Sequence, residues 1–357
     1  MRIETEVKLD YSDVLIRPKR STLESRKDVI LERTFKFLHS TKSWTGIPIM
    51  AANMATTGTF SMAKELSKHK IITTLHKYYS VDQLEKELPV LNQPHYVAYT
   101  MGIRDSDFEK LDLILDKGLD KYFDFVCLDV PNGYLERFSR CVKKVRSLLP
   151  DHILIAGNVV TNEMTEELLL QGADIIKIGI GPGATCLTRR KTGVGYPQLS
   201  AVIESADAAH GISNNKGYGL IIADGGIVFP ADIGKAYCAG ADFTMMGSMF
   251  AGYDQSEGEI IEENGKKFML HFGSSSNTAL KTFYGKVDEH RTSEGRTVKV
   301  PLKGDIKILL NDIFGSLRST GTYIGARRLK EFPKRATFIL VKTQLNNSLD
   351  SFDTRIN

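Results

Sequence analysis

The chain has 357 residues and a formal net charge of +4 at pH 7; 25% of its residues are charged and 42% are hydrophobic. This composition is ordinary for a soluble globular enzyme and allows one large α/β domain or two medium ones. The mild charge suits an anionic small ligand better than a nucleic-acid groove, and no apolar stretch is long enough to span a bilayer. We therefore expect neither nucleic acid nor membrane as a partner.

The first residues alternate charges with isolated apolar side chains and lack the apolar core of a secretory signal. The four cysteines show neither metal-ligand nor disulfide-framework spacing: Cys127, Cys141, Cys186 and Cys238. We expect a cytoplasmic protein with reduced thiols. Residues 1–45 are polar and predict an irregular cap rather than a domain of their own.

From residue 48 on, short apolar runs alternate with stretches of helical spacing. The apolar runs predict strands at residues 48–54, 71–76, 95–102, 124–130, 152–158, 174–180, 219–226 and 242–248. Helices are predicted at residues 60–70, 81–91, 107–119, 134–149, 162–173 and 304–326. Continuous apolar strands that alternate with helices are typical of a parallel sheet covered on both faces.

Eight such units favour an α/β protein with a closed (β/α)8 TIM barrel over an open doubly wound sheet, which more often stops at about five to seven strands. We predict a single domain over residues 1–345, including the cap at 1–45. Residues 250–303, between the eighth strand and its helix, predict a long flap, and the Asn264-Gly265 pair within it predicts a hairpin. The polar residues 346–357 predict a disordered tail.

A barrel carries its chemistry at the carboxyl ends of its strands, so the residues after each strand are site candidates. Cys186 follows the sixth strand in a glycine-rich loop, with Thr188 two residues on and the basic run 189–191 behind it. A thiol beside cations ionises more readily, and the thiolate is its reactive form. Cys186 is therefore a candidate nucleophile, although most intracellular cysteines are small core residues.

Two glycine-containing loops follow the seventh and eighth strands, Asp224-Gly225-Gly226 and Gly247-Ser248. Such loops commonly hold a phosphate through backbone N–H groups, and Ser248 could add a hydroxyl donor. Asp224 would repel a phosphate, so we expect it to accept hydrogen bonds from ribose hydroxyls if it faces the ligand. The alternative for each loop is a tight turn without a ligand.

Three further charged residues could contact a ligand or have a structural role. The two roles are equally open for Lys77 and Asp129, whereas a solvated loop glutamate is the commoner role for a residue such as Glu294. Lys77 ends the second strand, Asp129 ends the fourth, and Glu294 is the carboxylate of the flap segment SEGR. Glu294 could face a purine base or hold a proton for a departing amine. No Walker loop and no dinucleotide-binding fingerprint occur, so a nicotinamide cofactor would have to bind without a Rossmann unit. The histidines lack metal-ligand spacing, and we expect no catalytic zinc.

Several motifs together resemble the family shared by inosine monophosphate dehydrogenase and guanosine monophosphate reductase. They are GIGPGATCLTRRKTGVGYPQLSAV around Cys186, DGGI, GSMFAG, FGSSSNTA and RTSEGRTVKVP. The similarity runs from KLDYSDVLIRPKRS near the start to STGTYIGA, nearly the whole chain. TRRKTGVGYPQ is similar to the reductase branch. Only residues 77–94 separate the second and third strands, where the dehydrogenase usually carries a regulatory domain, and the flap has no obvious arginine-tyrosine dyad.

The resemblance implies reductive deamination of guanosine monophosphate (GMP) to inosine monophosphate (IMP) and ammonia with NADPH, in purine nucleotide salvage. Cys186 would form a covalent thioimidate at C2 of the base, while Thr188 and Glu294 would handle the proton of the leaving amine. The residues that match the family's nucleotide site are Asp224, Gly225, Gly226, Gly247, Ser248, Gly273, Ser274, Ser275, Arg291, Ser293 and Gly295. Many relatives have methionine where this chain has Ser274, which leaves the base contact of that position open.

The resemblance also implies a cofactor site, a cation site and a homotetramer. The cofactor residues are Lys77, Asp129, Val130, Pro131, Ile180, Gly181, Ser274, Arg291, Ser319, Thr320, Gly321 and Thr322, with Ser25 and Arg26 from a neighbouring subunit. Potassium would be bound through Gly181, Gly183, Cys186 and Arg189.

Two alternatives stand beside the reductase. One is a dehydrogenase that oxidises IMP to xanthosine monophosphate with NAD. The other is a catalytically silent nucleotide-binding barrel, which the joint presence of Cys186, Thr188 and Glu294 disfavours because a pure binder needs no nucleophile.

Overall fold

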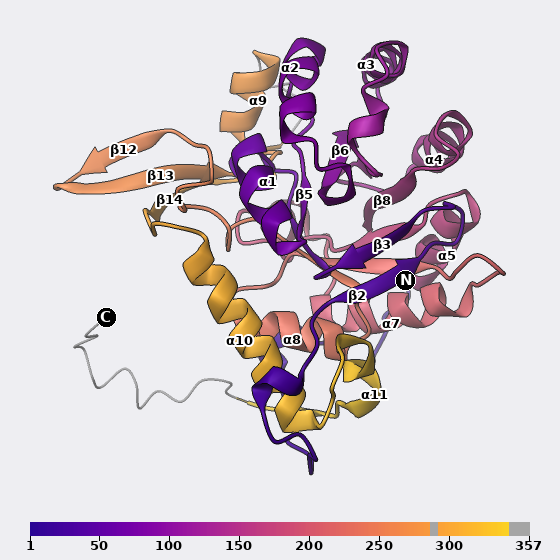
Figure 1. Ribbon diagram of the computed structural model, residues 1–357, viewed down its shortest axis with the longest axis vertical. Helices are drawn as coiled ribbons and strands as arrows, with labels where there is room; N and C mark the ends of the chain where they lie inside the picture. The colour runs from indigo at the N-terminus through magenta and orange to yellow at the C-terminus, as the bar shows by residue number, and fades with distance from the viewer. Residues whose placement is uncertain (286–291, 343–357) are drawn as a thin grey trace.

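The computed structural model describes residues 1–285 and 292–342, and it confirms the predicted barrel. Eight parallel strands close on themselves (Figure 1). In chain order they are β4 (Ile49–Ala51), β5 (Ile72–Thr74), β6 (Val97–Met101), β7 (Phe125–Asp129), β8 (Ile153–Val159), β9 (Ile175–Ile178), β10 (Leu220–Asp224) and β11 (Phe243–Met246). The closing pair is β11 with β4, in which Thr244 lies opposite Ile49.

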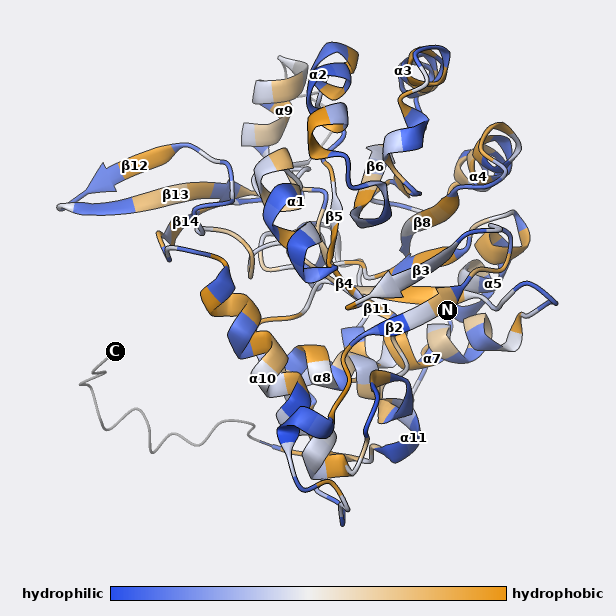
Figure 2. Ribbon diagram, viewed as in Figure 1, coloured by the Kyte–Doolittle hydropathy of each residue, from blue (hydrophilic) through white to orange (hydrophobic). Residues whose placement is uncertain are grey.

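Helices follow the strands and form the outer ring of the barrel (Figure 1). They are α1 (Phe60–Leu66), α2 (Val81–Leu91), α3 (Asp105–Asp116), α4 (Glu136–Leu148), α5 (Asn162–Leu170), α7 (Gln198–Gly211), α8 (Pro230–Cys238) and α10 (Lys307–Ile324). Figure 2 shows apolar and polar residues alternating along these helices, which is typical of helices with one face on a core. Within the described ranges, no helix combines the length and the apolar composition that a membrane span requires.

The amino-terminal segment covers the amino end of the barrel. Two strands in it, β2 (Arg33–Lys36) and β3 (Ser43–Gly46), form an antiparallel hairpin. Phe35 and Trp44 are buried, and Phe35 stacks on Phe243 of β11 with 4.6 Å between the ring centroids. The prediction of an irregular segment is therefore wrong here. Each of these strands has only one or two buried side chains, so the apolar pattern is too sparse to indicate a strand.

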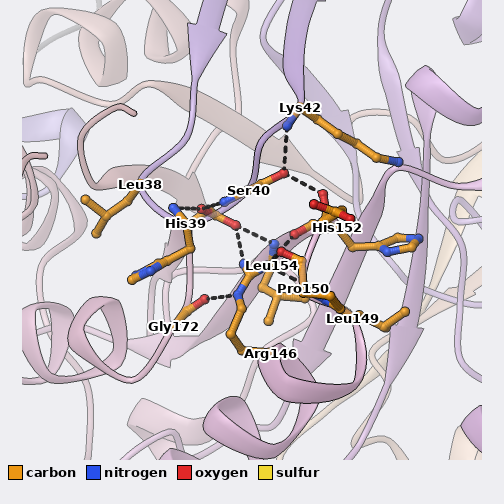
Figure 3. Close-up of polar contacts among 12 residues, drawn as sticks. Leu38, His39, Ser40, Lys42, Arg146, Leu149, Pro150, His152, Leu154 and Gly172 are labelled. Atoms are coloured by element: carbon orange, nitrogen blue, oxygen red, sulfur yellow. Dashed lines mark hydrogen bonds and ion pairs between the residues drawn. The ribbon is translucent and has the colours of Figure 1, made fainter. Parts of the chain in front are cut away.

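A buried ion pair ties the same end together (Figure 3). The Asp174 carboxylate, fully buried just before β9, accepts hydrogen bonds from the backbone N–H groups of His39, Ser40 and Leu154. It also pairs with Arg146 of α4 at 2.5 Å. Arg146 in turn donates to backbone carbonyl oxygens, including that of Gly172. Both carboxylate oxygens are hydrogen-bonded within the protein, so the role of this ion pair is structural.

Several short elements complete the fold. They are η1 (Tyr11–Asp13), β1 (Val14–Ile16), η2 (Arg26–Asp28), η3 (Ser67–His69), η4 (Pro94–Tyr96), η5 (Asp120–Tyr122), α6 (Thr188–Thr192), η6 (Leu329–Glu331), α11 (Phe332–Arg335) and β15 (Phe338–Leu340). Strand β1 pairs with β15, which joins the two ends of the described chain in one small sheet. The predicted tail at 346–357 lies outside the described residues.

The flap leaves the barrel after β11 and holds a three-stranded antiparallel sheet with a helix. Its elements are β12 (Ile260–Glu263), β13 (Lys266–Phe272), α9 (Asn277–Tyr284) and β14 (Thr297–Pro301). Asn264 and Gly265 join β12 to β13 with positive φ angles of 52° and 73°, as a two-residue hairpin turn requires. The predicted hairpin is confirmed, and Figure 1 shows it projecting from the barrel.

Candidate active site

A cavity of about 510 Å³ opens at the carboxyl ends of the barrel strands. Every barrel strand, at its end or in the loop that follows, contributes to the wall. One such residue for each strand in chain order is Asn53, Lys77, Gly102, Val130, Asn158, Gly179, Gly225 and Gly247. The flap closes the wall with residues 273–275 and 294–295. The site therefore lies where this fold places its chemistry.

The cysteine loop is held by glycines and by the flap. Gly179 and Gly181 have φ angles of 154° and 87°, in the region that favours glycine. The loop pairs with flap residues, because Leu187 N–H donates to the Glu294 carbonyl at 2.6 Å and Arg296 N–H to that of Thr185 at 2.9 Å. The flap thus fixes the backbone on both sides of the cysteine.

Three side chains form a hydrogen-bonded row that starts at the thiol. Cys186 Sγ lies 3.1 Å from Thr188 Oγ1, and Thr188 Oγ1 donates to Glu294 Oε2 at 2.7 Å. Cys186 is half-buried, and all three residues line the cavity. Because Thr188 donates to the carboxylate, its oxygen is left to accept from the thiol. Such a row can carry a proton between sulfur and carboxylate in either direction.

The first basic residue after the cysteine, at position 189, points away from the thiol. The Arg189 guanidinium pairs with Asp10 at 2.9 Å and donates to the Tyr196 carbonyl at 2.6 Å. Its stem packs closely on Gly181, where a Cβ atom would lie 2.6 Å from Arg189 Cγ. The structure therefore gives no ion pair or hydrogen bond between the Arg189 guanidinium and the thiol, and placement rather than this cation carries the nucleophile hypothesis.

A buried lysine that the sequence analysis did not single out lies between two of the predicted acids. Lys177 of β9 is 2% exposed, and its ammonium lies 2.6 Å from Asp129 Oδ1 and 3.2 Å from Asp224 Oδ2. Burial opposes the charge of Lys177, but the carboxylates of Asp129 and Asp224 outweigh it and raise the lysine pKa. Burial would raise the pKa of Asp129, and the nearby Lys177 and Lys77 charges lower it instead. These charged groups hold one another in place in the floor of the cavity.

Asparagine and glutamine side chains complete this cluster, and the sequence analysis missed them too. Asn158 of β8 donates to Asp224 Oδ2 at 2.8 Å, and Lys177 lies 3.4 Å from Asn53 Oδ1. Gln198, fully buried at the start of α7, donates to the Ile178 carbonyl at 2.7 Å. Asn158 could have been found from its position at a strand end, because that rule applies to any polar residue there.

The two glycine loops meet the cysteine loop and the flap. Gly225 and Gly226 have φ angles of 86° and 77°, and a Cβ atom on Gly225 would lie 3.3 Å from the Gly183 nitrogen. Ser248 also lines the cavity, and its hydroxyl lies 3.0 Å from His271 Nε2 of the flap. Three loops that are distant in sequence thus converge on one region.

Most of the predicted site residues come together in this cavity. Its lining includes Lys77, Asp129, Val130, Pro131, Ile180, Gly181, Gly183, Cys186, Thr188, Asp224, Gly225, Gly226, Gly247, Ser248, Gly273, Ser274, Ser275, Glu294 and Gly295. Ser293 is not part of the lining, and its hydroxyl lies 3.0 Å from the Gly295 carbonyl and 3.3 Å from that of Ser275. Arg291 lies outside the described residues.

Six predicted cofactor residues lie away from the cavity. Ser25 and Arg26 belong to the start of η2, and residues 319–322 form the last turns of α10. The two segments are neighbours, since a Cβ atom on Gly321 would lie 2.8 Å from Val29 Cγ1. Figure 1 shows this end of α10 beside the indigo amino-terminal segment and far from the flap.

The fold and the site define an α/β barrel with a half-buried thiol that faces a cavity at the carboxyl ends of the strands. Residues 8–347 match the family described as IMP dehydrogenase / GMP reductase domain. The GMP reductases of Escherichia coli (strain K12 / DH10B), Escherichia coli O157:H7 and Shigella boydii serotype 4 (strain Sb227) are each 55% identical to this chain. Each match spans 351 residues, 97% of this chain and 98% of the relative. The chain belongs to the IMP dehydrogenase/GMP reductase family and is an oxidoreductase, which confirms the resemblance seen in its sequence.

Proposed function

We propose that the protein catalyses the reductive deamination of GMP to IMP and ammonia with NADPH, in purine nucleotide salvage. The observation that carries this proposal is the row of Cys186 Sγ, Thr188 Oγ1 and Glu294 Oε2 on the cavity wall. It occurs in a chain 55% identical to proteins named GMP reductase. A nucleophile with a proton relay is what replacement of an amine on a purine ring requires.

The first half of the reaction uses the row in both directions. The thiol proton passes by way of Thr188 to Glu294, and the Cys186 thiolate attacks C2 of the guanine ring to form a C–S bond. The bond between C2 and the amino nitrogen then breaks. The proton returns through Thr188 to the departing amine, which leaves as ammonia. The product of this half is a thioimidate on Cys186, and the row has returned its proton.

The second half needs a reductant. NADPH, when bound, supplies the hydride that replaces sulfur at C2. The residues that would hold it near Cys186 are Lys77, Asp129, Val130, Pro131, Ile180 and Gly181, and Ser274 shares their part of the cavity wall. Charged and apolar side chains together suit a flat ring that carries a carboxamide. The C–S electron pair returns to Cys186 as a thiolate, and a proton taken up from solvent restores the resting thiol, so that one turnover consumes one proton.

The nucleotide would be held by the glycine loops. Backbone N–H groups at Gly225, Gly226 and Gly247 would approach the phosphate, with the Ser248 hydroxyl as a further donor. Asp224 would accept hydrogen bonds from the ribose. A potassium ion would be bound by backbone carbonyls of residues 181, 183, 186 and 189, because hard oxygen ligands suit a monovalent cation.

We further propose a cytoplasmic homotetramer, and the distant cofactor residues support the shared site that such an assembly would have. Ser25, Arg26 and residues 319–322 do not line the cavity of their own chain, so they would reach a cofactor only across a subunit boundary. Light scattering should give four times the mass of the chain. Mixed subunits of Cys186→Ser and Arg26→Ala should regain part of the activity that each variant lacks alone. A monomer with full activity would contradict this assembly.

Two assays test the proposed reaction. With NADPH and GMP, nicotinamide absorbance should fall; with NAD and IMP it should stay constant. Activity in the second assay alone would identify a dehydrogenase instead. When GMP is supplied without cofactor, intact-mass spectrometry should detect a purine adduct on Cys186. Glu294→Gln should lower kcat more than it weakens GMP binding. If kcat and GMP affinity fell by equal factors, Glu294 would only bind the base and would have no part in proton transfer.

A further inference from the structure

Strand β13 of the flap has a histidine at one of its buried positions, where the alternation of side chains along a strand would lead us to expect an apolar residue. Side chains alternate along a strand, and in β13 the buried positions are Met269 and His271, at 4% and 0% exposure. A histidine there must satisfy both ring nitrogens within the protein, because water does not reach it.

Both nitrogens have a hydroxyl partner, and the two partners come from different barrel loops. Nδ1 of His271 lies 2.6 Å from Oγ1 of Thr56, in the loop after β4. Nε2 lies 3.0 Å from Oγ of Ser248, in the loop after β11. Thr56 is 1% exposed, whereas Ser248 lines the cavity. The histidine therefore joins the buried hydroxyl of Thr56 to the hydroxyl of Ser248, which faces the cavity.

The ring is neutral at physiological pH. Burial, with a smaller effect of the Lys303 charge, lowers the pKa of His271 to about 4. A neutral imidazole has one N–H donor and one lone pair, so one hydroxyl donates to the ring and the other accepts from it. Which hydroxyl donates decides what Ser248 offers to the cavity.

Thr56 decides between these two arrangements. Its hydroxyl has His271 as its hydrogen-bond partner and no other among the described residues. If Nδ1 carried the proton, the buried Thr56 hydroxyl would have no acceptor for its own proton, and an unpaired buried donor is costly. Thr56 therefore donates to Nδ1, Nε2 carries the ring proton, and Nε2–H donates to the Ser248 oxygen. The proton of Ser248 is then free to point into the cavity.

We propose that His271 is a positioning residue that, oriented by Thr56, presents the Ser248 hydroxyl as a donor to an anionic oxygen of the substrate. In the opposite arrangement the Ser248 hydroxyl would donate its proton to the ring. Its lone pair would then face the anion and repel the anion. His271 thereby tunes the anion-binding end of the cavity without touching the ligand itself.

This inference rests on the proposed function, because it takes the anion to be the GMP phosphate. It is tested by direct binding of GMP and of guanosine, which lacks the phosphate, to the full-length protein by calorimetry. Ser248→Ala should weaken GMP binding about tenfold, as loss of a hydrogen bond to a charged group does, and change guanosine binding less than about twofold. His271→Phe should weaken GMP binding about fivefold, and it should add little in the Ser248→Ala background.

A matched pair separates positioning from packing. The side-chain amide of glutamine can occupy the place of Nε2 and donate to Ser248, whereas that of asparagine reaches only the place of Nδ1. His271→Gln should therefore keep GMP binding within about twofold and His271→Asn should lose as much as His271→Phe. A merely structural histidine predicts no such difference, and this comparison stands even if the phenylalanine variant fails to fold.

Three outcomes would overturn the inference. Additive losses in the Ser248→Ala, His271→Phe double variant would mean that the two residues act independently. Equal losses for GMP and guanosine would mean a general packing defect. A wild-type protein that binds no GMP would remove the proposed function and this inference together, whereas normal GMP reduction with unchanged affinity in His271→Asn would remove the inference alone.

Discussion

Strand β9 carries a buried ion pair at each of its ends, and the two pairs differ in what surrounds them. Asp174, just before the strand, has both oxygens occupied by Arg146 and three backbone N–H groups (Figure 3). Lys177, three residues on, holds Asp129 and Asp224, whose side chains stay 21% and 20% exposed to the cavity. The first pair has no remaining hydrogen-bonding capacity for a ligand, and the second has.

The contrast teaches that charge and burial alone do not distinguish a purely structural ion pair from one that can still bind a ligand. What distinguishes them is whether hydrogen-bonding capacity is left over. At the amino end of the barrel the hairpin of β2 and β3 covers the carboxylate and its partners. At the carboxyl end the loops stand apart and leave a space that a ligand can enter. Four substitutions or conditions would break or sharpen this comparison.

Cys186→Ser, at the carboxyl end of the barrel where the cavity opens, should have the largest effect, and this effect should be on turnover. Turnover should fall at least about 1,000-fold, because a serine hydroxyl is far less ionised than a thiol and forms no thioimidate. GMP affinity should stay within about tenfold, or roughly 1.4 kcal/mol. Steady-state kinetics and calorimetry check both values. Full activity in this variant would refute the covalent mechanism.

Arg146→Met should have the next largest effect, on stability alone. Removing one partner leaves the Asp174 carboxylate buried without its countercharge, which should cost about 3 to 5 kcal/mol of unfolding free energy. Denaturant unfolding measures it, and kcat of the folded fraction should stay within about twofold. A fall in kcat with unchanged stability would mean that the closed end also takes part in function.

Lys177→Met is the matched change at the open end. Asp129 and Asp224 would lose their shared cation and repel each other, so kcat/KM should fall about 100-fold through misplaced carboxylates. The stability loss should be smaller than for Arg146→Met, since water in the cavity can solvate both acids. An equal stability loss with unchanged kcat/KM would remove the distinction between the two ends.

The smallest expected effect is a pH dependence of stability, and it again arises at the amino end of the barrel. His210 lies 2.8 Å from the buried Asp242. Burial opposes the charge of His210, but the hydrogen bond to Asp242 and the negative charge of Asp242 together outweigh this and raise the His210 pKa above 6.5. A raised pKa means that the stabilisation is full below the unfolded value and is lost as pH rises through the folded one. Because His210 is partly exposed, unfolding free energy should fall by only a fraction of a kcal/mol between about pH 6 and pH 8. His210→Gln should remove this part of the pH dependence and leave kcat unchanged.

The barrel was readable from the sequence because its strands are buried on both faces. A run such as Ile175–Ile178 needs no alternation to indicate a strand, and eight runs with helices between them leave few other folds. The turn at Asn264-Gly265 was equally local, since those residues accept the positive φ angles that a tight hairpin demands. The hairpin of β2 and β3 was missed because it contributes so few buried side chains.

For the site, the sequence by itself determined which residues stand at strand ends, and the resemblance added roles for Cys186, Thr188 and Glu294. Only the tertiary structure decided which buried polar groups meet. Lys177 lies in an apolar strand and His271 in a flap strand, and neither has a charged or hydroxyl partner nearby in sequence. Their partners are brought in by barrel closure and by the return of the flap, which are long-range events. Burial follows from local pattern, whereas the partner of a buried polar group follows from the fold as a whole.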